Sequence, residues 1–451
     1  MKLDKYNKPV PRYTSFPPAN HFTSEFAGSD YRELIVASNN EKPAHIGIYV
    51  HIPFCRQRCF YCGCNSWELK DEKLVDTYMS AVKKEMQMVF ELLDKNRLVS
   101  LVHFGGGTPN SIPAGYITEI LDMVYAEFDF IEAPEIAIEC NPAYLDKHYI
   151  KELKEAGFNR FSLGVQDLDP TVLEAVNRKP PLMPLKEVTG YLRKDTAASV
   201  NMDFIYGLPK QTVDSFTETI KKAVELKPDR LVTFSYAHVP WLKEHQLKVE
   251  KAGLPPSEEK ANMFLSARKL LDKSGYESIG MDHFVLPGDE LYRAQQKNML
   301  HRNFQGYCSR RTTGQVYAFG VSAISQLSGA YSQNTKDMDK YTEGIEKGEF
   351  PVEKGYRLSD REKVIREIIT RLMCNYRLNW VQLQDELGDY TNDVREFADE
   401  KKLEEFAADS LIEYNRNGIR VTKEGMFFVR NIAASFDPFY KVQENKYSKP
   451  V

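Results

Sequence analysis

Four cysteines lie within one ten-residue stretch of this chain and are its side chains best suited to chemistry. The stretch reads CRQRCFYCGC and holds Cys55, Cys59, Cys62 and Cys64, whereas the other three of the seven cysteines are scattered. The polar start MKLDKYNKPVPRYT does not read as a signal or transit peptide, and no apolar run approaches the ~20 residues of a membrane span. We therefore expect a cytoplasmic protein without membrane contact, in which thiols stay reduced.

Three kinds of site compete for such a cluster. A disulfide staple is typical of small secreted chains, and this one has 451 residues with 42% hydrophobic content. A structural zinc site usually needs a second, distant ligand pair, and the sequence has no second CxxC and no HxxxH. An iron–sulfur cluster accepts thiolates spaced every few residues in one loop. The spacing Cys55-x3-Cys59-x2-Cys62 favours the third kind, because three thiolates leave the fourth iron of a [4Fe–4S] cluster open.

This CxxxCxxC spacing, with Tyr61 before the last cysteine, resembles the signature of the radical S-adenosylmethionine (SAM) superfamily. The resemblance implies one [4Fe–4S] cluster with Cys55, Cys59 and Cys62 as its ligands and SAM bound at the open iron. It implies that an electron from the reduced cluster breaks a C–S bond of SAM to give a 5′-deoxyadenosyl radical. A one-electron donor such as a flavodoxin or ferredoxin is then required.

Alternating strand-like and helix-like runs must position these groups. Apolar, β-rich runs recur at intervals of about thirty residues, with amphipathic helical runs between them. Six such units predict a parallel sheet, and because a closed barrel needs about eight, we expect an α/β fold with an open, partial (β/α)6 TIM-like barrel of the radical SAM type. The strand-like runs are 46–52, 100–104, 135–140, 160–166, 200–207 and 230–237, and the helical runs include 76–94, 114–128 and 212–226.

Chemically distinctive residues stand at the ends of these expected strands, where barrel enzymes build their active sites. The first run ends at the cysteine loop, the second at GGGTP (105–109), and later ones carry Glu139, Gln166 and Asp203. One such residue is ordinarily a loop cap or a satisfied hydrogen bond, but a succession of them indicates a shared site. Glycines let a backbone approach a ligand closely, although a tight turn is the alternative.

The regular pattern weakens after residue 237. Helices are expected over 256–274 and 361–376, and the strand-like run 316–325 could close the barrel side. The segment 394–433 reads helix, helix, hairpin, helix, with Asn417-Gly418 as the turn. This layout resembles a winged helix, but a net charge of -4 without a basic stripe argues against nucleic-acid binding.

These patterns divide the chain into three parts. We expect an N-terminal extension that covers the active site at 1–35, a radical SAM partial barrel at 36–326, and a mostly helical C-terminal lid domain at 327–451. We expect a monomer.

Motifs along most of the chain resemble one family of the superfamily, the oxygen-independent coproporphyrinogen III oxidases. The resemblance implies an oxidoreductase of heme biosynthesis that converts two propionates of coproporphyrinogen III to vinyl groups, giving protoporphyrinogen IX. Two relatives from the same superfamily stay open as alternatives, a heme-carrying chaperone and a heme-degrading methyltransferase. The motifs are PRYTSFPPA (11–19), YVHIPFCRQRCFYCGCN (49–65), HFGGGTP (103–109), GFNRFSLGVQD (157–167), DFIYGLPKQT (203–212), GMDHF (280–284), LHRNFQGY (300–307) and GVSAIS (320–325).

The same resemblance implies roles for residues at the strand ends. Cys64 matches a fourth cysteine that does not bind iron, and we assign it and His51 as catalytic; a small buried residue and a satisfied core histidine are the alternatives. The expected contacts of a first SAM are Tyr49, Gly106, Glu139 and Ile324, and those of a second SAM are Tyr61, Gly107, Thr108, Gln166, Arg178, Asp203 and Ala237.

A substrate with four carboxylates needs basic partners. The candidates are Arg12, Arg302 and Lys210, and Tyr13 and Phe16 could cover the bound ring. The family's usual tyrosine and threonine in the N-terminal motif are Phe16 and Pro18 here, which puts in doubt only hydroxyl contacts at the entrance.

Overall fold

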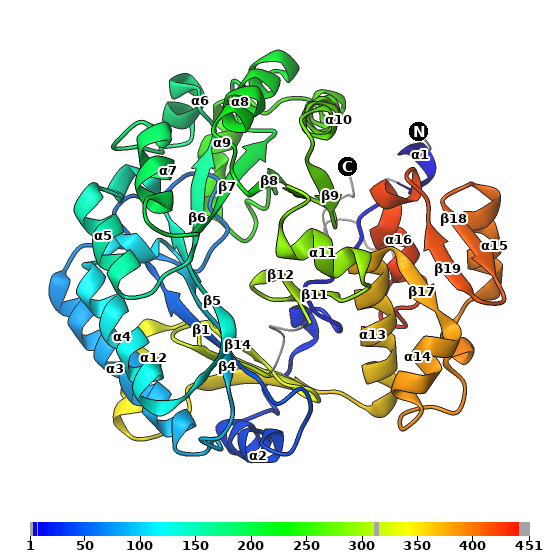
Figure 1. Ribbon diagram of the computed structural model, residues 1–451, viewed down its shortest axis with the longest axis horizontal. Helices are drawn as coiled ribbons and strands as arrows, with labels where there is room; N and C mark the ends of the chain where they lie inside the picture. The colour runs from blue at the N-terminus through cyan, green and yellow to red at the C-terminus, as the bar shows by residue number, and fades with distance from the viewer. Residues whose placement is uncertain (1–2, 7, 311–314, 442–451) are drawn as a thin grey trace.

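A large, mostly parallel sheet forms the frame of the protein (Figure 1). The computed structural model describes residues 3–6, 8–310 and 315–441, so the outermost residues of the expected terminal parts lie outside the described ranges. Within these ranges, twelve strands pair in the order β16-β15-β14-β13-β1-β4-β5-β6-β7-β8-β10-β9. None of the helices in these ranges is long and apolar enough to cross a membrane.

The middle of the sheet is parallel throughout. Apolar runs such as IGIYVHI are buried on both faces, as is typical of parallel strands covered by helices. Their bounds follow the six expected runs closely, and the expected open barrel is confirmed. The parallel strands are β1 (Ile46–Ile52), β4 (Val99–Gly106), β5 (Phe130–Cys140), β6 (Arg160–Gln166), β7 (Ser199–Tyr206), β8 (Arg230–Ser235) and β13 (Gln315–Phe319).

Helices cover the outer, convex side of this curved sheet (Figure 1). Side chains that accept hydrogen bonds from the first turn begin several of them: Asp71 caps α3, Asp146 caps α5, and Thr212 forms a capping box with Ser215 at α8. Each helix buries one apolar face against the strands. The main helices of this layer are α3 (Glu72–Phe90), α4 (Ala114–Glu127), α5 (Lys147–Glu155), α7 (Leu185–Arg193), α8 (Val213–Glu225) and α10 (Ser257–Lys273).

The sheet does not close on itself. The run expected as one strand at 316–325 forms two, β13 and β14 (Ile324–Gln326), because the chain turns at Gly320 with a φ of +101°. β13 pairs with β1, at the opposite edge of the parallel region from β8. Antiparallel strands extend both edges: β10 (His283–Val285) and β9 (Glu277–Ile279) beyond β8, and β15 (Ala330–Asn334) and β16 (Val352–Arg357) beyond β14.

The C-terminal part has its own core and a small sheet in the order β17-β19-β18. Asn415 pairs with Gly418, so the two turn residues are Arg416 and Asn417, one position earlier than expected. Side chains of the N-terminal segment, including Tyr13 and Phe16, are buried in this core. The elements are α13 (Asp360–Asn375), β17 (Arg377–Asn379), α14 (Trp380–Leu387), α15 (Glu400–Ala408), β18 (Ile412–Asn415), β19 (Gly418–Val421) and α16 (Val429–Ala434).

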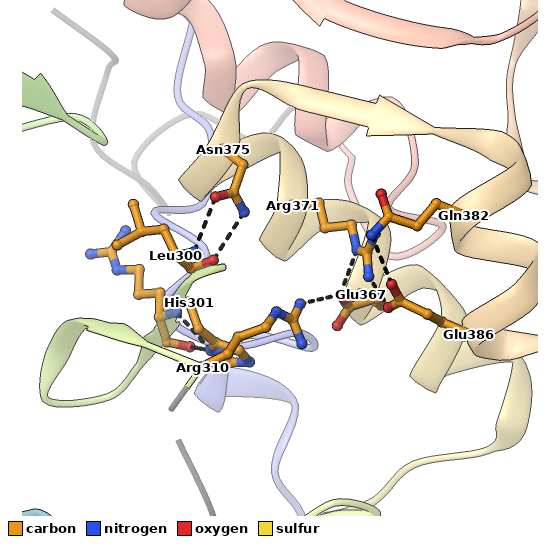
Figure 2. Close-up of polar contacts among 9 residues, drawn as sticks. Leu300, His301, Arg310, Glu367, Arg371, Asn375, Gln382 and Glu386 are labelled. Atoms are coloured by element: carbon orange, nitrogen blue, oxygen red, sulfur yellow. Dashed lines mark hydrogen bonds and ion pairs between the residues drawn. The ribbon is translucent and has the colours of Figure 1, made fainter. Parts of the chain in front are cut away.

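An ionic network joins the barrel side to this C-terminal part (Figure 2). Arg310, which follows the hairpin of β11 (Leu300–Asn303) and β12 (Gly306–Ser309), pairs with Glu367 of α13. Glu367 also accepts a hydrogen bond of 2.7 Å from Arg371 Nε, and Arg371 pairs with Glu386 of α14. Both backbone groups of Leu300 bond the side chain of Asn375. The hairpin is therefore held on α13 by buried charges and paired backbone groups.

Candidate active site

The cysteine loop leaves the sheet at the carboxyl end of β1. Its base is closed by two short parallel strands, β2 (Phe54–Cys55) and β3 (Trp67–Glu68), in which Trp67 N donates to Pro53 O at 2.7 Å. Cys55 is buried, Cys59 and Cys62 are partly exposed, and Cys64 is exposed. The loop thus presents four thiols from one short, anchored segment.

Cations and hydrogen-bond donors surround these thiols. Arg178 Nη1 lies 3.5 Å from Cys59 Sγ and donates to Tyr61 Oη at 3.1 Å. A hydrogen bond from Cys64 lowers the pKa of Cys62 to about 6, whereas burial raises the pKa of Cys55 to about 11. Within the described ranges, no three His, Cys, Asp or Glu side chains converge as ligands of a single ion. A four-iron cluster fits this donor set, since each of its thiolates binds a different iron.

A segment that follows β8 fastens the cysteine loop from outside. Lys243 Nζ donates to Cys64 O at 3.0 Å, His245 Nε2 donates to Cys62 O at 2.8 Å, and Gln246 Nε2 donates to Tyr61 O at 2.9 Å. We call residues 237–247 the covering loop. The sequence analysis missed these three residues, because they lie where the regular strand–helix pattern has faded.

The glycine run at the end of β4 packs directly on the cysteine loop. Gly107 N donates to Ile52 O at 2.8 Å and Thr108 N to Phe54 O at 2.9 Å, while Thr108 Oγ1 lies 3.4 Å from Cys55 Sγ. A Cβ on Gly107 would stand 2.9 Å from Phe54 O, and one on Gly106, whose φ is +116°, would stand 2.7 Å from the His51 ring. The glycines are therefore required for this close approach of two strand ends.

His51 and Glu139 lie beside this junction. His51 Nε2 donates to Asn65 O at 3.1 Å, and its Nδ1 lies 3.2 Å from Tyr49 Oη. Burial lowers the pKa of His51, so the ring is neutral and both nitrogens have partners. Glu139 Oε1 lies 3.1 Å from His103 Nε2, and Oε2 accepts from Gly106 N at 3.4 Å. His103 lies within the quoted glycine motif but was missed as a site residue.

The neighbouring strands β6 and β7 bring an amide and an acid close together, since Gln166 ends β6 and Asp203 lies in the second half of β7. Gln166 has a φ of +71°, and its buried Oε1 has no hydrogen-bond partner among the described residues. Asp203 accepts hydrogen bonds of 2.9 Å from both Ser162 and Asn201, and burial raises its pKa to about 6. A buried, unpaired amide oxygen is costly unless a ligand pairs with it, which suits a binding role for Gln166.

Two expected SAM contacts lie further out. Ala237 is exposed at the start of the covering loop, just after β8. Ile324 begins β14 and packs near Phe22 and Tyr331, at the opposite side of the parallel region. The structure therefore gathers the expected residues of β1, β4, β5, β6 and β7 and sets these two at the flanks.

The basic residues expected to bind the substrate carboxylates lie in two different places. Arg12 Nη2 pairs with Asp282 at 2.9 Å, and Arg302 Nη1 donates to Arg12 O at 3.2 Å. Lys210 is exposed in the turn after β7 and takes part in none of the ion pairs of the described residues. Tyr13 donates to Asp437 at 2.9 Å and Phe16 stacks on Phe439, so neither ring stands free to cover a ligand in this conformation.

The chain is similar to known proteins along nearly its whole length. Residues 49–223 match the Radical SAM superfamily. Over its full length the chain is 39% identical to an oxygen-independent coproporphyrinogen III oxidase of Synechocystis sp., covering 97% of that protein. It is 36% identical to the enzyme of the same name from Escherichia coli over 97% of this chain and 95% of that one. The solved structure of the coproporphyrinogen III oxidase HemN from Escherichia coli, described as a radical SAM enzyme, superposes with a TM-score of 0.89 at 35% identity, covering 97% of this chain and 98% of that one.

Proposed function

This chain belongs to the oxygen-independent coproporphyrinogen III oxidase family, and we propose from that premise how its own residues serve the reaction. The protein is a radical SAM oxidoreductase that uses a [4Fe–4S] cluster and SAM. It acts on coproporphyrinogen III, removing one hydrogen atom, one electron and carbon dioxide from each of two propionates to leave vinyl groups. The observation that carries the site proposal is the contact of the cysteine loop with the glycine run of β4 at one edge of the parallel sheet.

The cysteine loop is the proposed place of the cluster, with Cys55, Cys59 and Cys62 as its ligands. When bound, the reduced cluster and SAM supply a one-electron cleavage that yields a species able to abstract hydrogen from carbon. Arg178, 3.5 Å from Cys59 Sγ, offsets the negative charge of the thiolates and could bind a carboxylate as a fixed fork. Glu139 and Asp203 offer carboxylates for an ammonium and a hydroxyl, and Gln166 offers its unpaired oxygen.

The other residues expected to contact SAM are proposed for a first or a second SAM molecule, as in the sequence analysis. Tyr49, Gly106 and Ile324 are proposed for the first SAM, while Tyr61, Gly107, Thr108 and Ala237 are proposed for the second. His51 acts in this proposal by positioning, because its neutral ring spans Tyr49 and the backbone of Asn65. Cys64 is proposed as a catalytic thiol that does not bind iron; its exposure and its hydrogen bond to Cys62 support a place at the rim of the cluster site.

We propose further that the protein works in the cytoplasm as a monomer and takes electrons from a flavodoxin or ferredoxin. A reducing compartment keeps the three thiols available for iron. For the domains, we propose Ser359, the N-cap of α13, as the division in place of residue 326, because β15 and β16 pair within the large sheet.

An anaerobic turnover assay tests the function. The chain is reconstituted with iron and sulfide, given reductant, SAM, coproporphyrinogen III and a one-electron acceptor from cell extract, and its products are read by mass spectrometry. Loss of two carbon dioxide units with formation of 5′-deoxyadenosine supports the oxidase. Deoxyadenosine without decarboxylation would contradict the substrate, and neither product from a protein with a verified cluster would favour a heme-carrying chaperone.

A further inference from the structure

A cavity of about 470 Å³ lies between the barrel and the C-terminal part. Its walls come from the ends of β7 and β8, the first half of the covering loop, α10, residues 280–282 and residues 426–430, with Arg12 from the N-terminal segment. This volume falls within the roughly 300–1,000 Å³ of pockets for small molecules. The covering loop borders the cavity with Trp241 and bonds the cysteine loop with Lys243, so the cavity adjoins the proposed cluster site.

The charge in this cavity is strongly unbalanced. The lining residues include four cationic side chains, Arg12, Lys260, Arg268 and Arg430, against the single carboxylate of Asp282. That carboxylate is already paired with Arg12 at 2.9 Å and also bonds His283 at 2.8 Å. The walls therefore hold an excess of positive charge in a place partly shielded from water, which favours an anionic ligand.

Lys260 and Arg268, both on α10, are the two cations of this cavity that are best placed to bind an anionic ligand. Lys260 Nζ donates to the backbone oxygen of Tyr236 at 2.6 Å, and Arg268 lies over the Phe427 ring at 4.6 Å from its centre. Neither forms an ion pair with a carboxylate among the described residues. A Cβ on Gly207 would stand 2.9 Å from Lys260 Cδ, so the glycine after β7 makes room for the lysine to cross into the cavity. Burial and the charge of Arg12 lower the pKa of Lys260 to about 8, which an anion nearby would reverse.

Arg430 has a different place in the same wall. It is buried and donates to Pro11 O at 3.1 Å and to Val10 O, which holds the N-terminal segment beside the cavity. Arg430 therefore serves to position Arg12, and its role differs from that of the two cations of α10.

Large apolar side chains line the same cavity as the cations. Trp241 is 60% exposed, and Phe264, Phe427 and Leu254 also contribute to the lining. Apolar walls with a few convergent charges suit a ligand that combines a broad ring system with carboxylates.

We propose that this cavity binds carboxylates of the porphyrinogen, with Lys260 and Arg268 as their direct partners and Trp241 against the ring. The inference rests on the proposed function, since that function supplies a substrate with four carboxylates. It also adds the two cations of α10 to the candidates named from the sequence, of which Arg12 lines this cavity and Lys210 does not.

The test measures binding separately from turnover. Coproporphyrin III, the oxidised form of the substrate with the same four carboxylates, is titrated into the full-length reconstituted protein and its fluorescence is followed. We expect the double variant Lys260→Gln/Arg268→Gln to bind it at least tenfold more weakly, because two charge-assisted hydrogen bonds are lost. Lys269→Gln, which removes an exposed charge from the same helix, should bind like the wild type. The uncharged tetramethyl ester should bind the double variant and the wild type equally.

Turnover measurements then distinguish a failure of this inference from a failure of the proposed function. In the double variant the KM for coproporphyrinogen III should rise at least tenfold, while Lys269→Gln should keep the KM of the wild type. If the wild type removes two carbon dioxide units but the double variant matches it in Kd and KM, the cavity inference is overturned and the function stands. If the wild type binds coproporphyrin III through these cations without decarboxylating the substrate, the function fails and the cavity inference stands. Lys260→Arg, which keeps the charge, should retain binding and serves if the double variant does not fold.

Discussion

Glu367 offers the sharpest test of how the C-terminal part is held on the barrel. Its carboxylate lies between Arg310 and Arg371 with 16% of the side chain exposed. In Glu367→Gln, two guanidinium groups remain close together without the anion between them. Breaking one partner of a buried ion pair costs about 3–5 kcal/mol in free energy of unfolding, so we expect a loss of that size.

The pKa of Glu367 gives a second route to the same magnitude. Burial alone would raise this pKa, but Arg310 and Arg371 outweigh it and lower the pKa from 4.5 to about 2. A lowered carboxyl pKa stabilises the fold above the unfolded-state value, and the contribution is lost as pH falls from about 4.5 toward 2. At 1.36 kcal/mol per unit, the shift corresponds to roughly 3 kcal/mol at neutral pH.

The measurement is urea unfolding under anaerobic conditions, followed by tryptophan fluorescence. Glu396→Gln is the matched control, because it removes one carboxylate from an exposed pair with Arg361, where the loss should stay below about 1 kcal/mol. The difference in free energy of unfolding between the wild type and Glu367→Gln should be constant from pH 7 to about 5 and should become smaller only below about pH 4.5. A variant no less stable than the control, or a gap that does not change with pH in this way, would refute the reasoning.

Three further predictions concern the site. Cys55→Ala should lose the cluster absorbance and the activity together, whereas Cys308→Ala, outside the loop, should keep both. An active Cys55→Ala protein with an intact cluster would contradict the assignment of Cys55 as a ligand. Gly107→Ala should lower cluster occupancy and should cost about 1–3 kcal/mol in free energy of unfolding through overpacking, because its Cβ would stand 2.9 Å from Phe54 O. Gly115→Ala, whose Cβ would have no atom within 4 Å, is the control and should leave both cluster occupancy and stability unchanged. Asp203, with a pKa of about 6, should bind SAM more weakly as pH falls below that value, and Asp203→Asn should bind weakly without this pH dependence; calorimetry that finds the same profile in both proteins would contradict its role.

The sequence predicted the parallel strands well because their signal is local. β1 and β6 have the bounds expected from their apolar runs, and the cysteine loop, the glycine run and Glu139 follow from their places at or beside strand ends. Asp203 lies inside β7, which ends at Tyr206. The turn at Gly320 lies inside a continuous apolar run and carries no such signal, so the split of 316–325 into β13 and β14 was missed.

Charged residues were harder to place than strands. A lysine in a motif and a lysine in an ordinary helix look alike in sequence, and only the fold distinguishes exposed Lys210 from Lys260 in a cavity wall. His103 was missed for a related reason, because its role depends on Glu139 of the neighbouring strand. Such contacts depend on tertiary structure, which residue spacing does not contain.

The burial of the N-terminal segment in the C-terminal core also orders events during synthesis. Tyr13 bonds Asp437, and Arg430 bonds the backbone at Val10 and Pro11, so the first residues made must wait for nearly the last. At ~5–20 residues per second, that wait is roughly 20 to 85 s. Throughout it the strands of the barrel are emerging while the cavity still lacks the wall formed by residues 426–430. The cavity that we propose for the porphyrinogen therefore becomes complete only when translation is nearly finished.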